Sequence, residues 1–285
     1  MGYTKPTTIT EIDLSNADLP LHGKTYTVIP HRSIIDHTEN LLRENNFNIK
    51  KKTFKSNVNA RVAQGIYQIV STQDPDLGMM FAWSNSYDKS TRFQCGIGAY
   101  VFVCNNGMIH GDMATFARKH TGSADIEVQN QISSQVKYAR KHFGQLIKDK
   151  DQFKNEYLSI KSQAELLGRL FAEEEILDAT QLSCVKNEMK KPSYDYKCDL
   201  NNAWTFYNHV THSLKLSHPR SWMTDQQKFH KFMTTELLSQ VNLHNHDYTS
   251  LKVNIPEDGV YQGDLSEITA DLEAQDFDTF GDFKI

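Results

Sequence analysis

The sequence lacks a long apolar run, and this excludes a protein with membrane-spanning helices. No stretch of its 285 residues approaches the roughly 20 consecutive apolar residues that a spanning helix needs. Residues 1–10 are polar and lack the apolar core of a secretory signal. We therefore expect a soluble protein of the cytoplasm that has no membrane partner.

Cysteine is scarce, and metal-ligand patterns are weak. The four cysteines (Cys95, Cys104, Cys184 and Cys198) are far apart and form no C-x-x-C pair, which is typical of reduced thiols in an intracellular protein. The densest groups of other ligand-type residues, His209 with His212 and His244 with His246, lack the spacing of a structural zinc site or a hydrolase helix. We expect neither a metal nor a cofactor.

Motifs for nucleotide binding and hydrolysis are missing as well. The chain contains no G-x-x-x-x-G-K-S/T loop, no G-x-G-x-x-G loop and no G-x-S-x-G elbow. We therefore expect a protein without enzyme activity and without catalytic residues. The acid pairs Asp74/Asp76 and Asp195/Asp199 leave a metal-dependent nuclease open as an alternative, although solvated loop residues explain them as well.

Apolar and aromatic residues are plentiful enough for a sizeable core, at 39% and 11% of the chain. Alternation predicts extended segments near 47–55, 58–71 and 79–84, and most clearly at 93–104, where the turn residues Asn105, Asn106 and Gly107 follow. We predict an α+β fold in which an antiparallel strand meander (about 47–104) is packed by long helices and followed by C-terminal helices and an acidic tail.

Helical spacing predicts the remaining elements. A first helix begins at Ser33, and two long helices follow from Val128 and from Phe153, with a break at 149–151. Residues 186–202 resemble a loop, 203–216 form a helix, and capping-box spacing at 224–227 begins another helix toward Val241. The predicted domains are an N-terminal arm (1–30), a single α+β domain (30–250) and a flexible acidic tail (251–285).

Charge is divided unevenly along the chain. Nine acidic residues and one basic residue fall within 256–285, so this segment carries −8, whereas the 30 basic and 26 acidic residues before it give +4. An acidic tail on a basic body is typical of interaction proteins. The simpler alternative is an end that only keeps the protein in solution.

Basic residues gather in the predicted strands and the first long helix, where they could neutralise nucleic-acid phosphates while nearby aromatic rings stack on bases. A solvated surface explains such residues equally well. The candidate nucleic-acid-binding residues are Lys50, Lys51, Lys52, Lys55, Arg61, Arg118, Lys119, Lys137, Arg140 and Lys141.

The last ten residues, DFDTFGDFKI, interleave carboxylates with Phe277, Phe280 and Phe283. A polar segment gains little from exposing three phenylalanines unless a partner buries them, so we predict that they bind a protein partner. The segment resembles the acidic tails of single-stranded-DNA-binding proteins, but it ends in Lys-Ile rather than in the aromatic residue.

Short motifs are also similar to those of one family. Residues 83–90 (WSNSYDKS), 98–107 (GAYVFVCNNG), 118–121 (RKHT) and 204–211 (WTFYNHVT) resemble, in order, motifs of the phage- and plasmid-borne proteins catalogued as domain of unknown function 932. The resemblance spans about 30–242 and implies a mobile-element setting without a settled chemistry. The matching polar residues form either a site or structural hydrogen bonds, and we favour the latter; they are Asn85, Ser86, Asp88, Cys104, Asn105, Arg118, His120 and Thr121.

Three hypotheses follow. The first is a phage- or plasmid-type protein that binds nucleic acid, most readily single-stranded DNA, during replication or recombination. The second is an interaction protein that binds or inhibits a host defence or replication protein. The third is the metal-dependent nuclease. A homo-oligomer remains open under each of them.

Overall fold

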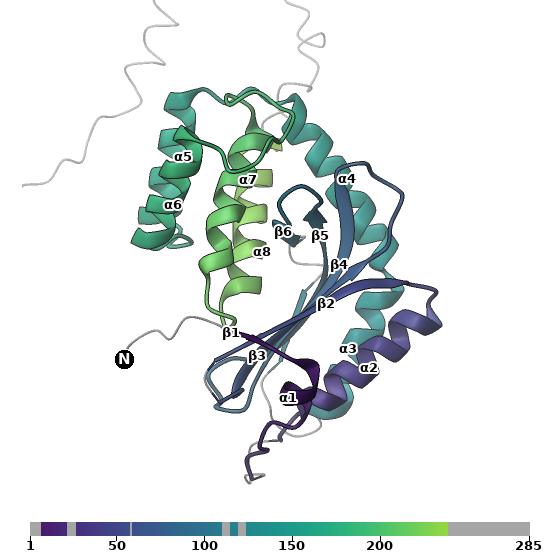
Figure 1. Ribbon diagram of the computed structural model, residues 1–285. Coiled ribbons are helices and arrows are strands. Elements are labelled where there is room, and N and C mark those ends of the chain that lie inside the picture. Colours follow the sequence, from purple (N-terminus) through teal and green to yellow (C-terminus); the bar gives the residue numbers. More distant parts are fainter. Residues whose placement is uncertain (1–6, 22–26, 58, 110–114, 119–123, 239–285) are drawn as a thin grey trace, which may run out of the picture. The chain divides into compact units, whose positions relative to one another are not determined.

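The computed structural model describes residues 7–21, 27–57, 59–109, 115–118 and 124–238 (Figure 1). The chain divides into two units, Met1–Asn242 and Leu243–Ile285. The tail expected at 251–285 lies outside the described residues. The helices and strands of the structure all belong to the first unit. Within the described residues, no helix combines the length and the apolar character required to cross a membrane.

A seven-stranded antiparallel sheet forms the centre of this unit. Its order is β1-β2-β3-β4-β5-β6, and β7 also pairs with β5, so the predicted α+β class and antiparallel meander are confirmed. The strands are β1 (Thr7–Ile9), β2 (Ile49–Ser56), β3 (Val62–Ile69), β4 (Leu77–Ser86), β5 (Phe93–Val101), β6 (Gly107–Ile109) and β7 (Thr115–Arg118).

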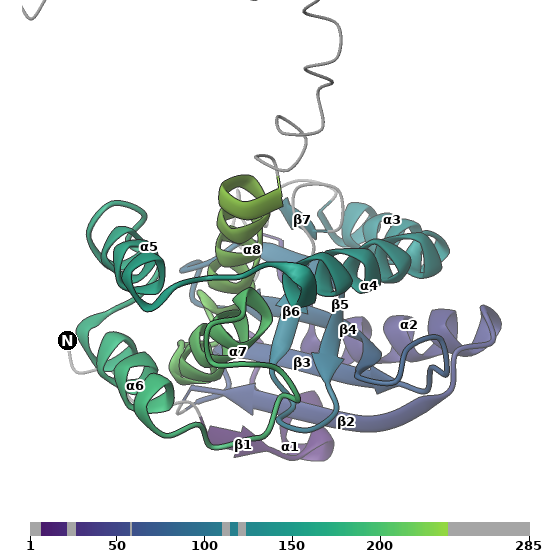
Figure 2. The same cartoon turned by 90° about the horizontal axis from the view of Figure 1, so that it is seen from above.

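One face of the sheet packs against the main core. Phe81 and Trp83 of β4 and Cys95 and Ile97 of β5 point to this face because residues two apart share a side of a strand. Helices α2 (His31–Glu44), α3 (Ala124–Lys137) and α4 (Ala139–Asn155) cover it (Figures 1 and 2). We call it the core face.

The opposite face, which we call the second face, is covered over β4, β5 and β6. Met80 and Tyr100 there form a smaller apolar cluster with Trp222 and Met223 of α8 (Trp222–Met233). The other C-terminal elements are α5 (Ile160–Ala172), α6 (Ala179–Lys190), α7 (Ala203–Ser213), η1 (Leu214–Leu216) and η2 (Thr234–Leu238). Helix α7 lies beside α8, and α6 and α5 lie beyond α7, whereas η1 and η2 contact α8 (Figure 1).

The predicted helix break at 149–151 is wrong. These residues lie inside α4, and the break falls at Tyr138, between α3 and α4. The polar residues are accommodated because Lys150 Nζ binds Asp74 Oδ2 at 2.5 Å, and Asp149 Oδ2 lies 3.0 Å from His230 Nε2. Long-range pairs therefore bury Asp149 and Lys150, two residues of a polar run that would otherwise predict a solvent-exposed break, whereas Asp151 is exposed.

Three other boundaries differ from prediction. The loop expected at 186–202 is helical up to Lys190 because α6 is held by a capping box between Asp178 and Gln181. Helix α8 begins at Trp222, not at Thr224, whose hydroxyl instead lies 3.1 Å from Gln94 Nε2. The N-terminal arm is part of the domain, since β1 pairs with β2 and α1 (Glu11–Ser15) follows it.

Candidate nucleic-acid interface

Lysines alternate along the edge region of the sheet. Lys51 and Lys55 of β2 point to the second face, opposite Gln68 and Gln64 of β3. The register places no acidic residue on the second face of β2, β3, β4 or β5. These two lysines therefore have no carboxylate partner on their own side of those four strands.

Lys52 differs from its neighbours because it points to the core face. Its Nζ lies 2.7 Å from Glu11 Oε2 and 2.9 Å from Glu39 Oε1. Burial lowers the pKa of Lys52, but the hydrogen bonds to both carboxylates outweigh this and raise it overall. The triple lysine is thus divided between two faces, and Lys52 is already neutralised.

Three cations lie over aromatic rings near this edge. Lys50 Nζ is 5.9 Å from the ring centroid of Phe102, Arg140 Cζ is 5.1 Å from that of Phe47, and Lys137 Nζ is 5.8 Å from that of Tyr138. Phe102 and Tyr138 are 39% and 49% exposed. The surface therefore combines positive charge with two exposed aromatic residues.

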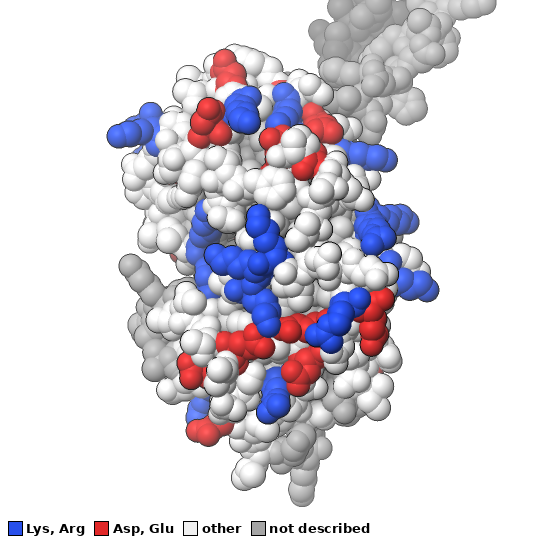
Figure 3. Space-filling view, turned by 45° about the vertical axis from the view of Figure 1, so that its right-hand side comes forward, with Lys and Arg blue, Asp and Glu red and all other residues white. Residues whose placement is uncertain are grey.

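Lysine and arginine side chains gather across the middle of one side of the molecule, above a band of acidic side chains (Figure 3). Lys50, Lys51, Arg140 and Lys141 are all exposed. Arg61 is exposed as well, at the turn between β2 and β3. The elements that carry the interface are therefore the start of β2, the segment after β5 and the junction of α3 with α4.

Part of the predicted set cannot be placed. The backbone of Arg118 ends β7, opposite Phe93, but Lys119, His120 and Thr121 lie outside the described residues, as do Phe277, Phe280 and Phe283.

The described family-motif residues form structural hydrogen bonds. Asn85 Nδ2 donates to the Ile29 carbonyl oxygen at 2.8 Å and lies 3.0 Å from His31 Nδ1, so it anchors the chain before α2 to β4. Ser86 Oγ donates to the Thr91 carbonyl oxygen and accepts from its N–H. Asp88 Oδ1 accepts the Ser90 N–H.

These motif residues do not form one polar cluster. The antiparallel register places Val101, at the end of β5, beside Leu77, at the start of β4, whereas Asn85 lies near the end of β4. Asn105, with a positive φ of 54°, follows Val101 and accepts a hydrogen bond from Gln68. The hairpin therefore separates Asn85 from Asn105 by most of the length of β4.

The pattern of the sequence did not indicate Lys215. It lies in the three-residue η1, where Nζ donates to the Cys104 carbonyl oxygen at 2.6 Å and is 5.7 Å from the ring centroid of Tyr194. A single lysine between two leucines carries no motif, so only its position in the fold identifies it.

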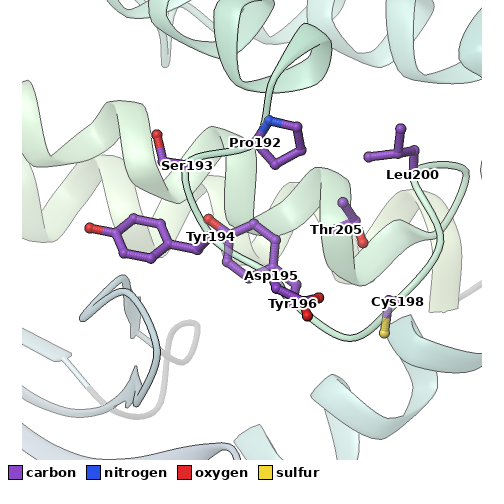
Figure 4. A pocket seen from close by; sticks show the side chains of 8 residues that line it. All are labelled: Pro192, Ser193, Tyr194, Asp195, Tyr196, Cys198, Leu200 and Thr205. Atoms are coloured by element: carbon purple, nitrogen blue, oxygen red, sulfur yellow. The ribbon is translucent and has the colours of Figure 1, made fainter.

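The loop after α6 borders a cavity of about 330 Å³ that includes Tyr194, Asp195, Tyr196 and Thr205 (Figure 4). Its lining includes the carboxylate of Asp195 and no lysine or arginine, so it does not suit a phosphate. Among the described residues, no group of three or more His, Cys, Asp and Glu side chains is arranged to hold a metal ion.

One comparison with known proteins finds a match. The family model described as domain of unknown function (DUF932) matches residues 19–236. No curated protein matches the chain, and neither does any solved structure. The match includes the sheet from β2 onward and the cationic and aromatic residues described above, and it ends before the acidic segment.

Proposed function

The chain belongs to the family described as domain of unknown function (DUF932), and we propose that this member binds nucleic acid, with single-stranded DNA as its ligand. The observation that carries the proposal is the pairing of cations with two exposed aromatic residues, Phe102 and Tyr138, and with the partly buried Phe47 just before β2. A role in the replication or recombination of a phage or plasmid is part of the same proposal.

Binding would exchange weak internal contacts for stronger ones. A cation over an exposed ring contributes about 0.5–1 kcal/mol, whereas a base stacked on an aromatic side chain contributes about 1–3 kcal/mol. A base that stacks on Phe102 therefore displaces Lys50 at a net gain. The displaced ammonium group is then available to a phosphate of the same strand.

The exposed rings favour a single strand over a duplex. Stacking on Phe102 or Tyr138 requires a base whose face is uncovered, and a duplex hides its base faces between neighbouring pairs. The cations alone would serve either ligand, because neutralisation of phosphates carries no information about strand number. We therefore expect the aromatic residues to decide the preference for a single strand.

Labelled single- and double-stranded oligonucleotides, titrated across a salt series, test the proposal. The affinity should fall steeply with salt, and Arg140→Ala combined with Lys141→Ala should reduce the slope for single strands by about 0.7 for each phosphate that is no longer neutralised. The matched control replaces Lys186 and Lys190, which are exposed on α6, and should leave the slope unchanged. Folded protein at micromolar concentration that binds no oligonucleotide at about 50 mM salt would rule the proposal out.

A protein partner is the second candidate function, and it rests on the sequence of the last ten residues. Phe277, Phe280 and Phe283 alternate with carboxylates there. Such a segment suits an apolar pocket that is rimmed by basic residues. The partner would be a host replication or defence protein.

A further inference from the structure

Phe102, the residue on which the proposed function places a base, lines a second cavity. The volume of this cavity is about 270 Å³, which is small for a ligand pocket and suits a single planar ring system. The turn before β4, the residues after β5, the loop after α6 and helix α7 all contribute to its lining. Besides Phe102, its apolar walls include Pro75, Val103, Tyr196 and Trp204.

The aromatic walls of this cavity are held in place by their neighbours. The Phe102 N–H donates to the Asp76 carbonyl oxygen at 2.9 Å, which ties the segment after β5 to the turn before β4. Trp204 is almost completely buried and stacks on Tyr207, with ring centroids 5.7 Å apart. Tyr196 is also buried. The cavity is therefore preformed, and a ring that enters it needs little rearrangement of the walls.

Two carboxylates line the cavity, and they differ in their partners. Asp76 Oδ2 lies 2.5 Å from Lys154 Nζ and 3.6 Å from Lys150 Nζ. Asp195 Oδ1 accepts the Lys197 N–H at 2.8 Å. In the described part of the chain Asp195 forms no ion pair, not even with Lys197, which also lines the cavity. A carboxylate only accepts hydrogen bonds, so Asp195 suits a ligand that donates them.

We propose that this cavity binds a nucleobase that carries an exocyclic amino group, such as cytosine. The inference rests on the proposed function and adds to it a preference among bases. The base would stack on Phe102 and donate its amino N–H to the carboxylate of Asp195, as cytosine N4 does to acidic side chains elsewhere. Thymine and uracil present the acceptor O4 at the position of N4, so the carboxylate would repel them. The phosphate of the same nucleotide would stay outside, near Lys50, which lies over the ring of Phe102.

Short single strands of deoxycytidine and of deoxyuridine, equal in length, test this preference at mildly alkaline pH, where cytosine is uncharged. The two ligands have the same backbone charge and the same ring size, and their bases differ in the groups at the N4 and O4 position. The wild type should bind the deoxycytidine strand about fivefold more tightly, which is the fold-change for roughly 1 kcal/mol of discrimination between bases. Fluorescence anisotropy measures both affinities.

Asp195→Asn keeps the size of the side chain and an oxygen for the Lys197 N–H, but it removes the charge and one acceptor. This variant should bind the two strands with nearly equal affinity. The matched control is Asp199→Asn, because Asp199 is exposed in the same loop, accepts the Asn201 N–H at 2.8 Å and does not line the cavity. The control should keep the preference. If Asp195→Asn lowers the melting temperature, Asp195→Ser provides a second variant, since its hydroxyl also accepts the Lys197 N–H.

Failure of the base site can be distinguished from failure of the nucleic-acid function. If the wild type binds both strands but does not prefer deoxycytidine, or if Asp195→Asn keeps the preference, the base site is wrong and the nucleic-acid function stands. If Asp195→Asn and Asp199→Asn remove the preference alike, it depends on the charge of the loop and not on the cavity, and the base site is again wrong. If the wild type binds neither strand, both proposals are wrong.

Discussion

Phe102 has a ring that is 39% exposed directly after β5, with Lys50 over its face. If bases stack on this ring, Phe102→Ala should weaken single-strand binding by about 1–3 kcal/mol and leave duplex binding almost unchanged. Fluorescence anisotropy with both ligands measures the difference. Phe171 is an almost equally exposed phenylalanine on α5, so Phe171→Ala is the matched control, and equal effects of the two variants would contradict a stacking role.

His209 is almost completely buried in α7, and burial lowers its pKa from 6.5 to about 4. The folded state therefore binds fewer protons than the unfolded state between these values, so stability falls as the pH drops from 6.5 to about 4. The depression corresponds to roughly 3 kcal/mol of lost stability. Urea unfolding at a series of pH values measures it.

The two titratable neighbours of His209 shift its pKa in opposite directions. His212 lowers the pKa of His209 and Glu188 raises it. The pKa of Glu188 is itself lowered below 4.5, because hydrogen bonds from Ser193 outweigh the effect of burial. The stability that Glu188 contributes is therefore lost as the pH falls through this lowered pKa. His209→Gln should flatten the dependence between pH 6.5 and 4, and an unchanged curve in this variant would assign the dependence to other groups.

At the scale of the elements, β3 and β4 approach each other at a glycine. A Cβ atom on Gly65 would come within 2.4 Å of the indole of Trp83, its cross-strand partner. Trp83 is fully buried, so the ring cannot move aside freely. Gly65→Ala should therefore destabilise the protein by about 1–3 kcal/mol, as overpacking does in well-packed cores.

In helix α4, replacement of a glycine by alanine should have the opposite effect on stability. Apart from the nearby backbone of α4 itself and the two chain neighbours, no heavy atom lies within 4 Å of a Cβ placed on Gly144, and alanine favours the helix by about 1 kcal/mol over glycine. Gly144→Ala should therefore stabilise the protein. Urea midpoints of the two variants test both expectations, and a destabilised Gly144→Ala would show that α4 is more tightly packed than the structure indicates.

At the scale of the whole molecule, the charges of the two parts of the chain oppose each other. Residues 256–285 carry −8, and the preceding residues carry +4. The carboxylates should compete with nucleic acid for the basic surface, through interactions screened beyond roughly 8 Å at physiological salt. Deletion of residues 260–285 should therefore tighten oligonucleotide binding at low salt and leave the melting temperature unchanged.

A variant that keeps the charge of this segment separates its two predicted roles, which are competition with nucleic acid and binding of a protein partner. Replacement of Phe277, Phe280 and Phe283 by alanine keeps every carboxylate, so nucleic-acid binding should not change while the protein no longer captures its partner. A deletion that unfolds the domain would show instead that the phenylalanines belong to its core. If the deletion changes neither nucleic-acid binding nor capture of a protein partner, the segment only keeps the protein in solution.

Several features of this protein follow from the order of its residues alone. Alternation over 93–104 identified the strand β5, although the strand ends at Val101. Helical spacing identified α7, and the predicted turn at 105–107 falls close to the observed one, which covers 102–106 because Gly107 already begins β6. Family motifs spread over the chain indicated the matched family. These features could be predicted from the sequence because each pattern involves residues that are close together in the chain.

Other features depend on packing between distant segments. The polar run in α4 is helical because Lys150 reaches Asp74, and Lys52 is set apart from Lys51 because α2 brings Glu39 to the core face. The antiparallel β4–β5 hairpin separates Asn85 from Asn105, and η1 brings Lys215 to the Cys104 carbonyl oxygen. No local pattern encodes such pairings, since the free energy of burying a charge or an amide depends on the partner that the fold places beside it.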